Sequence, residues 1–311
     1  MLGFGMASSH APGIFCPTDM WPKVYASIPE SMKGSQPPTA KLETPAVREA
    51  MAKRIAQAFK VLRDQLHAYR PDALLVIGDD QNDLFGMCNQ PTLSVFTGKE
   101  IWGSSKPRYM SDIPPEASRI HLKVHTELAM DLLKGLIKRN FDPSNLAEMN
   151  PQGRDPARGA SHMLMYPAPV LMPALDIPVI PVFLNEYFPP LPSGRRCWDL
   201  GLAIADIFKH HKARVAIYAS GGLSHDPFGP RSGWIDEPLD RWIMDRIATN
   251  RGEELANLFS FDSATMRSGT GEIRAWITAA AACPRAGVMV DYMPIHHVKT
   301  GIGFAYWPAI E

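Results

Sequence analysis

Apolar residues along the chain form short continuous runs that alternate with longer stretches of helical period. Residues 45–69 carry an apolar side chain every three or four positions, which predicts one amphipathic helix. Thr44 is a good N-cap, Pro45 suits the first helical position, and Pro71 ends the segment. The same kind of pattern predicts further helices over 119–140, 197–210, 236–260 and 271–283.

Continuous apolar runs predict strands that are buried on both faces. Such runs cover 1–6, 73–77, 178–184 and 214–219, and shorter ones at 288–290 and 303–306 predict closing strands. Strands that alternate with amphipathic helices are typical of an α/β protein. We therefore expect one domain over residues 1–311, with a central mixed β-sheet flanked by helices on both faces. Residues 11–43 have weak periodicity and predict a long loop, of the kind that often covers a site.

Polar residues follow three of the predicted strands, at 8–10, 78–83 and 220–225. Ligands of open α/β sheets bind outside the carboxyl ends of the strands, so we expect these segments to meet at one pocket. They contain His10, His225 and the acidic stretch 79–83. That composition suits a metal site with nitrogen and oxygen ligands, or a site for general acid/base chemistry. The acidic stretch is equally consistent with a solvated turn.

Composition excludes several functions. The 311 residues include 32 Lys plus Arg and 32 Asp plus Glu, so a basic surface for nucleic acid is not expected. No apolar window is long enough for a transmembrane helix, and the N-terminus lacks the basic start of a secretory signal. These features predict a cytoplasmic protein that does not bind membranes. The four cysteines form no CxxC pair, which argues against a zinc ribbon or a thioredoxin-type site.

The standard motifs of nucleotide and hydrolase sites do not occur. No GxGxxG follows a strand, and GxxxxGK[ST], HExxH and GxSxG are missing. Arg195 and Arg196 offer two guanidinium groups for a substrate carboxylate, but their position at a predicted helix start is more typical of exposed residues. His296 and His297 are adjacent, and in a strand only one of them would face a pocket.

Six segments, taken together and in order, resemble the catalytic subunits of class III extradiol ring-cleaving dioxygenases, the protocatechuate 4,5-dioxygenase superfamily. They are SSHAPG at 8–13, LLVIGDDQNDLF at 74–85, ASHMLMYPAPVLMP at 160–173, IPVIPVFLNEYFPPLPSGRRCWDLGLAI at 177–204, RVAIYASGGLSHDPFG at 214–229 and GTGEIRAWITAAAA at 269–282. The resemblance covers most of the chain. The Gly-Asp-Asp-Gln form at 78–81 is nearest the 3-O-methylgallate dioxygenase type.

The resemblance implies a non-haem Fe(2+) enzyme that uses O2 to open the ring of a catechol- or gallate-type aromatic acid, and a homodimer as the default assembly. His10 and Glu272 stand where the family has metal ligands, and His225 where it has the catalytic acid/base. His162 matches a pocket histidine near the substrate. Gln81 replaces the second histidine ligand of the family. An amide oxygen is a weaker donor than imidazole, so Asp79 or Asp80 is an alternative third ligand.

Two other functions remain open from the sequence. One is a metal-dependent hydrolase or lyase on a related ring-derived acid, with Mn or Zn and without oxygen activation, which the glutamine at position 81 suggests. The other is a non-catalytic subunit, against which the presence of His10, His225 and Glu272 argues. Without the resemblance, Glu272 is consistent with a simple carboxylate at a helix start, and His225 with a turn histidine.

Overall fold

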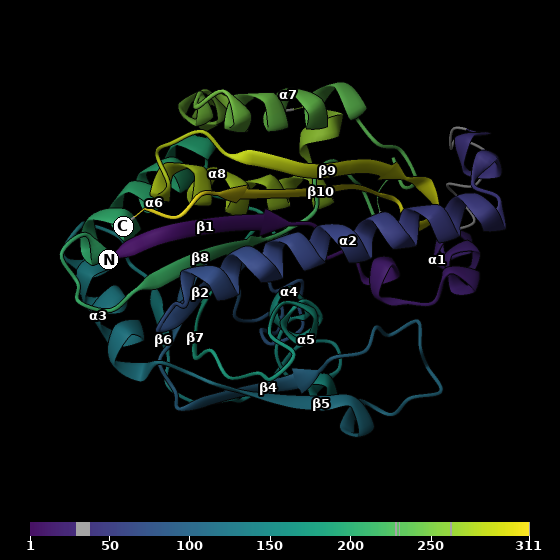
Figure 1. Ribbon diagram of the computed structural model, residues 1–311. Coiled ribbons are helices and arrows are strands. Elements are labelled where there is room, and N and C mark those ends of the chain that lie inside the picture. The colour runs from purple at the N-terminus through teal and green to yellow at the C-terminus, as the bar shows by residue number, and fades with distance from the viewer. Residues whose placement is uncertain (29–37, 228, 230, 262, 311) are drawn as a thin grey trace.

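A single mixed sheet of eight strands forms the centre of the protein (Figure 1). The computed structural model describes residues 1–28, 38–227, 229, 231–261 and 263–310. Across the sheet the strands are β6 (Ser144–Leu146), β3 (Leu93–Phe96), β7 (Val179–Leu184), β2 (Ala73–Gly78), β8 (Val215–Ser220), β1 (Leu2–Ser8), β10 (Thr300–Trp307) and β9 (Val288–Ile295). The α/β class and the mixed sheet expected from the sequence are confirmed.

The four central strands, β7, β2, β8 and β1, run parallel to one another. Every residue of these strands is buried, as their continuous apolar runs predict. β10 then pairs antiparallel with β1, and β9 antiparallel with β10. Because four neighbouring strands point the same way, their carboxyl ends share one edge of the sheet.

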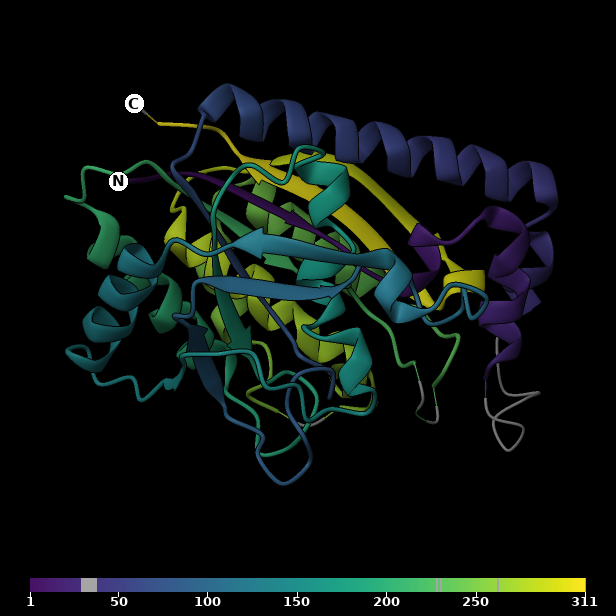
Figure 2. The ribbon, with the colours of Figure 1, turned by 90° about the horizontal axis from the view of Figure 1, so that it is seen from below.

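Helices cover both faces of the sheet (Figures 1 and 2). One face carries the long α2 (Pro45–Tyr69), which contacts β1, β9 and β10, together with the short α4 (His162–Met165) and α5 (Ala168–Leu171). The other carries α8 (Ile273–Ala282), α6 (Gly194–Phe208) and α3 (Thr126–Ile137). α2 begins as predicted, with the Thr44 hydroxyl accepting a hydrogen bond from the amide of Val47 at 3.4 Å.

The remaining elements lie around this core. β4 (Glu100–Ser104) and β5 (Arg119–Lys123) form a separate antiparallel pair, α1 (Trp21–Ala26) precedes α2, and α7 (Glu237–Ala248) contacts β9. No helix within the described residues has both the length and the apolar character needed to cross a membrane.

The structure corrects three of the predicted elements. The helix expected over 119–140 is strand β5 followed by the shorter α3, and the one expected over 236–260 ends at Ala248. The predicted loop 11–43 contains α1 and three 3-10 turns, at Pro12–Phe15, Thr18–Met20 and Pro38–Leu42; its residues 29–37 lie outside the described residues. Strands β3, β4 and β6 were not predicted at all.

Candidate active site

Four strand ends and one helix start bring polar side chains together at the carboxyl edge of the sheet. His10 follows β1, Gln81 follows β2, Tyr187 follows β7 and His225 follows β8, while Glu272 directly precedes α8. All five line one cavity, called here the Glu272 cavity. The predicted convergence of the strand ends is therefore present.

The Glu272 carboxylate is the centre of this group and is 1% exposed. Its Oε1 accepts hydrogen bonds from Gln81 Nε2 at 2.7 Å and from the Tyr187 hydroxyl at 2.9 Å, and its Oε2 accepts from the Gly222 amide. Burial alone would raise the pKa of Glu272, but the neighbouring imidazoles of His225 and His10 outweigh it and hold that pKa well below its usual range. Glu272 is therefore an ionised carboxylate inside the protein.

His10 faces this carboxylate from the end of β1. Its Nδ1 is hydrogen-bonded to the Ser220 hydroxyl at 3.0 Å, while Nε2 is buried, lies 3.6 Å from Glu272 Oε2 and has no hydrogen-bond partner among the described residues. Burial lowers the pKa of His10 and so favours the neutral imidazole. A neutral imidazole nitrogen without a partner, next to an ionised carboxylate, is the donor pair that a divalent transition metal requires.

Gln81 is the candidate for the third member of this donor set. Within the described part of the chain, no group of three His, Cys, Asp or Glu side chains has the arrangement of a metal site. Gln81 reaches Glu272 with its amide nitrogen, and its oxygen would have to turn inward to ligate a metal, since an amide nitrogen carries no available lone pair. The residues are compatible with a metal held by His10, Glu272 and Gln81.

Asp79 and Asp80, the alternative ligands, have other surroundings. The Asp80 carboxylate accepts hydrogen bonds from the amides of Asp83, Leu84 and Phe85, which closes the loop after β2, and burial raises its pKa to about 7. Asp79 is buried, and its Oδ1 accepts from the Glu186 amide at 3.3 Å. Burial and the nearby Glu272 raise the pKa of Asp79 well above its usual value, which disfavours the ionised form that binds metals.

His225 presents one ring nitrogen to the cavity and uses the other for support. Nδ1 is 2.8 Å from the Leu223 carbonyl oxygen, which can only accept, so the Nδ1 proton is fixed there. Nε2 lies 3.1 Å from the Tyr187 hydroxyl and 3.4 Å from Glu272 Oε1. Although burial lowers the pKa of His225, the Glu272 charge and hydrogen bond outweigh this effect and raise it. Nε2 is thus the ring nitrogen of His225 that can exchange a proton with a group in the cavity.

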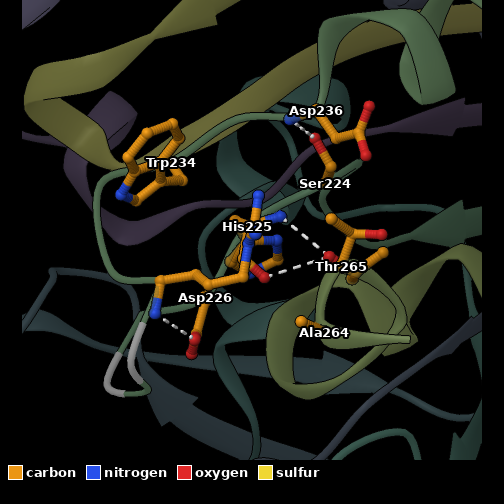
Figure 3. A pocket seen from close by; sticks show the side chains of 9 residues that line it. Ser224, His225, Asp226, Trp234, Asp236, Ala264 and Thr265 are labelled. Carbon is orange, nitrogen blue, oxygen red and sulfur yellow. Dashed lines mark hydrogen bonds between the residues drawn. The ribbon is translucent and has the colours of Figure 1, made fainter. Parts of the chain in front are cut away.

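Hydrogen bonds to Thr270 hold the backbone of His225 in place. Figure 3 shows the small cavity beside it, lined by Ser224, Asp226, Trp234 and Thr265 among others. The His225 amide donates to the Thr270 hydroxyl at 3.1 Å, and the Thr270 amide donates to the His225 carbonyl at 2.9 Å. Because Thr270 lies two residues before Glu272, this pair of bonds fixes the two functional side chains relative to each other.

A buried carboxyl group, Asp240 of α7, holds the residue before His225. It accepts hydrogen bonds from the Ser224 amide at 2.7 Å, the Ser224 hydroxyl at 2.9 Å and the Tyr292 hydroxyl at 2.8 Å. Burial raises the pKa of Asp240 to about 7. Asp240 therefore connects α7 and β9 to the loop that carries His225.

Replacing Asp240 with alanine is expected to lower the free energy of unfolding by about 2–4 kcal/mol, because it leaves three buried donors without an acceptor. Chemical denaturation measures this loss. Asp245→Ala is the matched control on the same helix, since Asp245 is half exposed and pairs only with Arg246, and a change below about 0.5 kcal/mol is expected. Equal stability of the two variants would show that Asp240 does not hold the loop.

His162 lies on the other side of His10, at the start of α4. The two rings meet edge to face with 4.8 Å between centroids. His162 Nδ1 is hydrogen-bonded to Asp83 Oδ2 at 2.7 Å, and Nε2 is buried without a hydrogen-bond partner among the described residues. Asp83 thus orients the ring of His162.

Other candidates from the sequence lie elsewhere. Arg195 and Arg196 are exposed residues of α6: Arg195 is near Asp199 and Glu253, and Arg196 covers the ring of Phe141. His296 and His297 form a 3-10 turn, not a strand, and both of their backbone amides donate to the Glu43 carboxylate.

Sequence reasoning missed several residues of the Glu272 cavity, among them Tyr187 and Lys299. Tyr187 follows β7, and the polar break at Asn185-Glu186 after that strand was a signal for a fourth strand end at the site. Lys299 precedes β10 and is buried, and burial lowers its pKa to about 8. Its ammonium lies 3.2 Å from the Ser27 hydroxyl. Lys299 comes into the site because β10 pairs with β1, which no local pattern indicates.

Comparison with known proteins defines the class. Residues 35–303 match the family described as the catalytic LigB subunit of aromatic ring-opening dioxygenase. Since this match covers most of the chain, the protein belongs to that family, in agreement with the resemblance noted from its motifs. The β1 segment with His10 precedes the matched region.

The curated relatives are named as ring-cleaving enzymes. The chain is 26% identical over 197 residues to a 2,3-dihydroxyphenylpropionate/2,3-dihydroxicinnamic acid 1,2-dioxygenase of Photorhabdus laumondii, with 63% of this chain and 56% of the relative covered. It is 24% identical over 172 residues to gallate dioxygenase of Pseudomonas putida, covering 53% and 46% respectively. The chain thus matches about half the length of these relatives.

Among solved structures, an uncharacterized protein of Escherichia coli K12 has a similar fold. The TM-score is 0.51 with 11% identity, and 98% of this chain and 99% of that one are covered. At this identity the likeness concerns the fold alone.

Proposed function

We propose that this protein is a non-haem iron(II) dioxygenase that opens the ring of a catechol- or gallate-type aromatic acid by extradiol cleavage. His10, Glu272 and Gln81 would hold the metal. The observation that carries the proposal is the buried, unpartnered His10 Nε2 lying 3.6 Å from the ionised Glu272, with His225 Nε2 3.4 Å from the same carboxylate. The names of the relatives support the ring-opening chemistry.

A ferrous ion bound there would chelate the substrate hydroxyls, lower their pKa and pass electron density to O2. The protein's own groups handle the protons. His225 Nε2 faces the cavity with Nδ1 already committed to Leu223, so it takes a proton from a substrate hydroxyl and later returns it. Tyr187 hydrogen-bonds both His225 and Glu272 and therefore orients the base relative to the metal ligand.

His162 borders the substrate on the opposite side of His10. Its Nε2 has no hydrogen-bond partner among the described residues, Asp83 fixes the ring in place, and His162 lines a second cavity that also contains Gln81. It can therefore hydrogen-bond a ring substituent or the attacking oxygen. A cytoplasmic homodimer, which the family resemblance implies, stays a prediction that fractionation and light scattering test.

Oxygen uptake tests the proposal directly. Protein purified without oxygen and reconstituted with iron(II) is offered protocatechuate, gallate, 3-O-methylgallate and 2,3-dihydroxyphenylpropionate in an oxygen electrode. We expect oxygen consumption equimolar with substrate and a yellow ring-cleavage product. Turnover with zinc or manganese that is independent of oxygen would contradict the proposal and favour a hydrolase or lyase. Tight association with a homologous chain and no metal would favour a non-catalytic subunit.

A further inference from the structure

A second cavity adjoins the Glu272 cavity and shares Pro12, Gln81 and Tyr109 with it. It is the larger of the two and is called here the arginine cavity. Beyond the shared residues it is lined by Ser27, Asp83, Arg108, Arg154, His162 and Tyr166. A substrate ring at the metal ligands therefore has open space beside it, past Gln81 and Tyr109, for a substituent.

The charges that line the arginine cavity do not cancel. Asp83 is paired twice, with Arg108 Nη2 at 2.5 Å and with His162 Nδ1 at 2.7 Å. Arg154 is exposed at the wall of the cavity, and its side chain makes no hydrogen bond or ion pair with any other described residue. Since the negative charge of Asp83 offsets that of Arg108, the positive charge of Arg154 is left over. The cavity therefore suits a ligand with one negative charge.

Arg154 is positioned by a close backbone contact. Its amide donates to the Asn82 carbonyl at 2.8 Å, and Gln152 makes a similar bond to Leu84. Between them, Gly153 packs so closely that an added Cβ would lie 2.0 Å from the Asp83 carbonyl oxygen, which only glycine permits. The segment 152–154 is thus attached to the loop that carries Gln81 and Asp83, which keeps Arg154 at the wall of the cavity.

We propose that Arg154 binds a carboxylate carried on a side arm of the aromatic substrate, an inference that rests on the proposed function. Arg108 is already neutralised by Asp83 and serves to hold Asp83 and His162 in place, whereas Arg154 has its planar donors available for a bidentate contact. Because Arg154 lines the arginine cavity while His10 and Glu272 line the Glu272 cavity, the carboxylate is on a short chain and not directly on the ring. This places the acid-binding group at Arg154, which lines a cavity, and not at Arg195 or Arg196, which line neither of the two cavities.

Two substrates that differ only in charge test the role of Arg154. 2,3-Dihydroxyphenylpropionate carries a carboxylate on a side arm, and 3-propylcatechol is a neutral analogue of similar size. In Arg154→Gln we expect KM for the acid to rise about 10- to 100-fold, the effect of losing one charged hydrogen-bonded contact, with kcat changed less than about twofold. The kinetics of the neutral catechol should be unchanged, and Arg154→Lys should recover part of the loss.

Arg195→Gln is the matched control, because it removes an exposed arginine of α6 that is outside both cavities. It should leave the kinetics of both substrates as in the wild type. If Arg154→Gln reduces turnover of the acid and the neutral catechol equally, the residue is structural and the proposal is wrong. It is also wrong if the wild-type enzyme shows no preference for the acid, although the dioxygenase activity itself would then stand.

Binding without turnover separates this inference from the proposed function. Anaerobic calorimetry of the metal-free protein with the same two compounds should show tighter binding of the acid, and Arg154→Gln should abolish that difference. If no catechol is cleaved by any metal-loaded form, the proposed function is wrong. Calorimetry alone then tests whether Arg154 binds the carboxylate. Equal binding of the acid by wild type and variant would overturn the role of Arg154.

Discussion

His225→Ala is expected to lower kcat by about 10²- to 10⁴-fold, the usual contribution of a positioned acid/base group, while bound metal stays near the wild-type amount. The metal is retained because His10 and Glu272 keep their contacts when the His225 ring is removed. The loss follows from the geometry of Nε2, the only ring nitrogen of His225 that faces the cavity, with Nδ1 bonded to the Leu223 carbonyl. Stopped-flow turnover and metal analysis of the same preparation measure both quantities.

Added imidazole provides a sharper readout for His225. Imidazole that enters the space left by the ring should restore part of the turnover, which a purely structural role would not allow. His121→Ala is the matched control, because His121 is half exposed on β5 and pairs with Glu100. Near-normal turnover in His225→Ala would show that another group carries the proton. The same conclusion follows if the variant loses both metal and turnover and imidazole restores neither.

The sequence predicted the centre of the fold better than its edges. Continuous apolar runs led directly to β1, β2, β7 and β8, because strands buried on both faces have no other pattern. β6 has the sequence Ser-Asn-Leu, which carries no such signal, and it forms by pairing with β3. In β5, Ile120 and Leu122 alternate with polar neighbours, a strand period that the following helical pattern of α3 obscured.

The sequence predicted that the strand ends meet at one site. It did not predict which side chains contact each other there. Gln81 and Glu272 are 191 positions apart and touch because β2 ends beside α8, which no local pattern encodes. Glu272 was identified by resemblance only, since a carboxylate at a helix start is ordinary. Glu272 differs from a solvated helix cap because it is 1% exposed and has three hydrogen-bond donors around it. These features are visible only in the folded structure.

Glu272→Gln is expected to weaken binding of iron(II) by at least about 100-fold and to reduce turnover in proportion. Losing a residue that only supports a metal ligand typically weakens metal binding by about 10- to 100-fold, and losing a ligand itself should weaken it more. The substitution removes the only charge of the donor set and places an amide NH2 among donors that already point at this position, from Gln81, Tyr187 and the Gly222 amide. Metal per protein after anaerobic reconstitution, followed by desalting, measures the loss.

Glu186→Gln is the matched control for Glu272→Gln. Glu186 is a second carboxyl group buried nearby, at 0% exposure, but burial and the neighbouring Asp79 and Glu272 raise its pKa well above the usual value. A neutral carboxyl group exchanged for an amide of the same shape should leave the metal content unchanged. If Glu186→Gln loses as much metal as Glu272→Gln, the effect is one of buried packing. If Glu272→Gln retains metal and turnover, Glu272 is not a ligand and the proposed metal site is wrong.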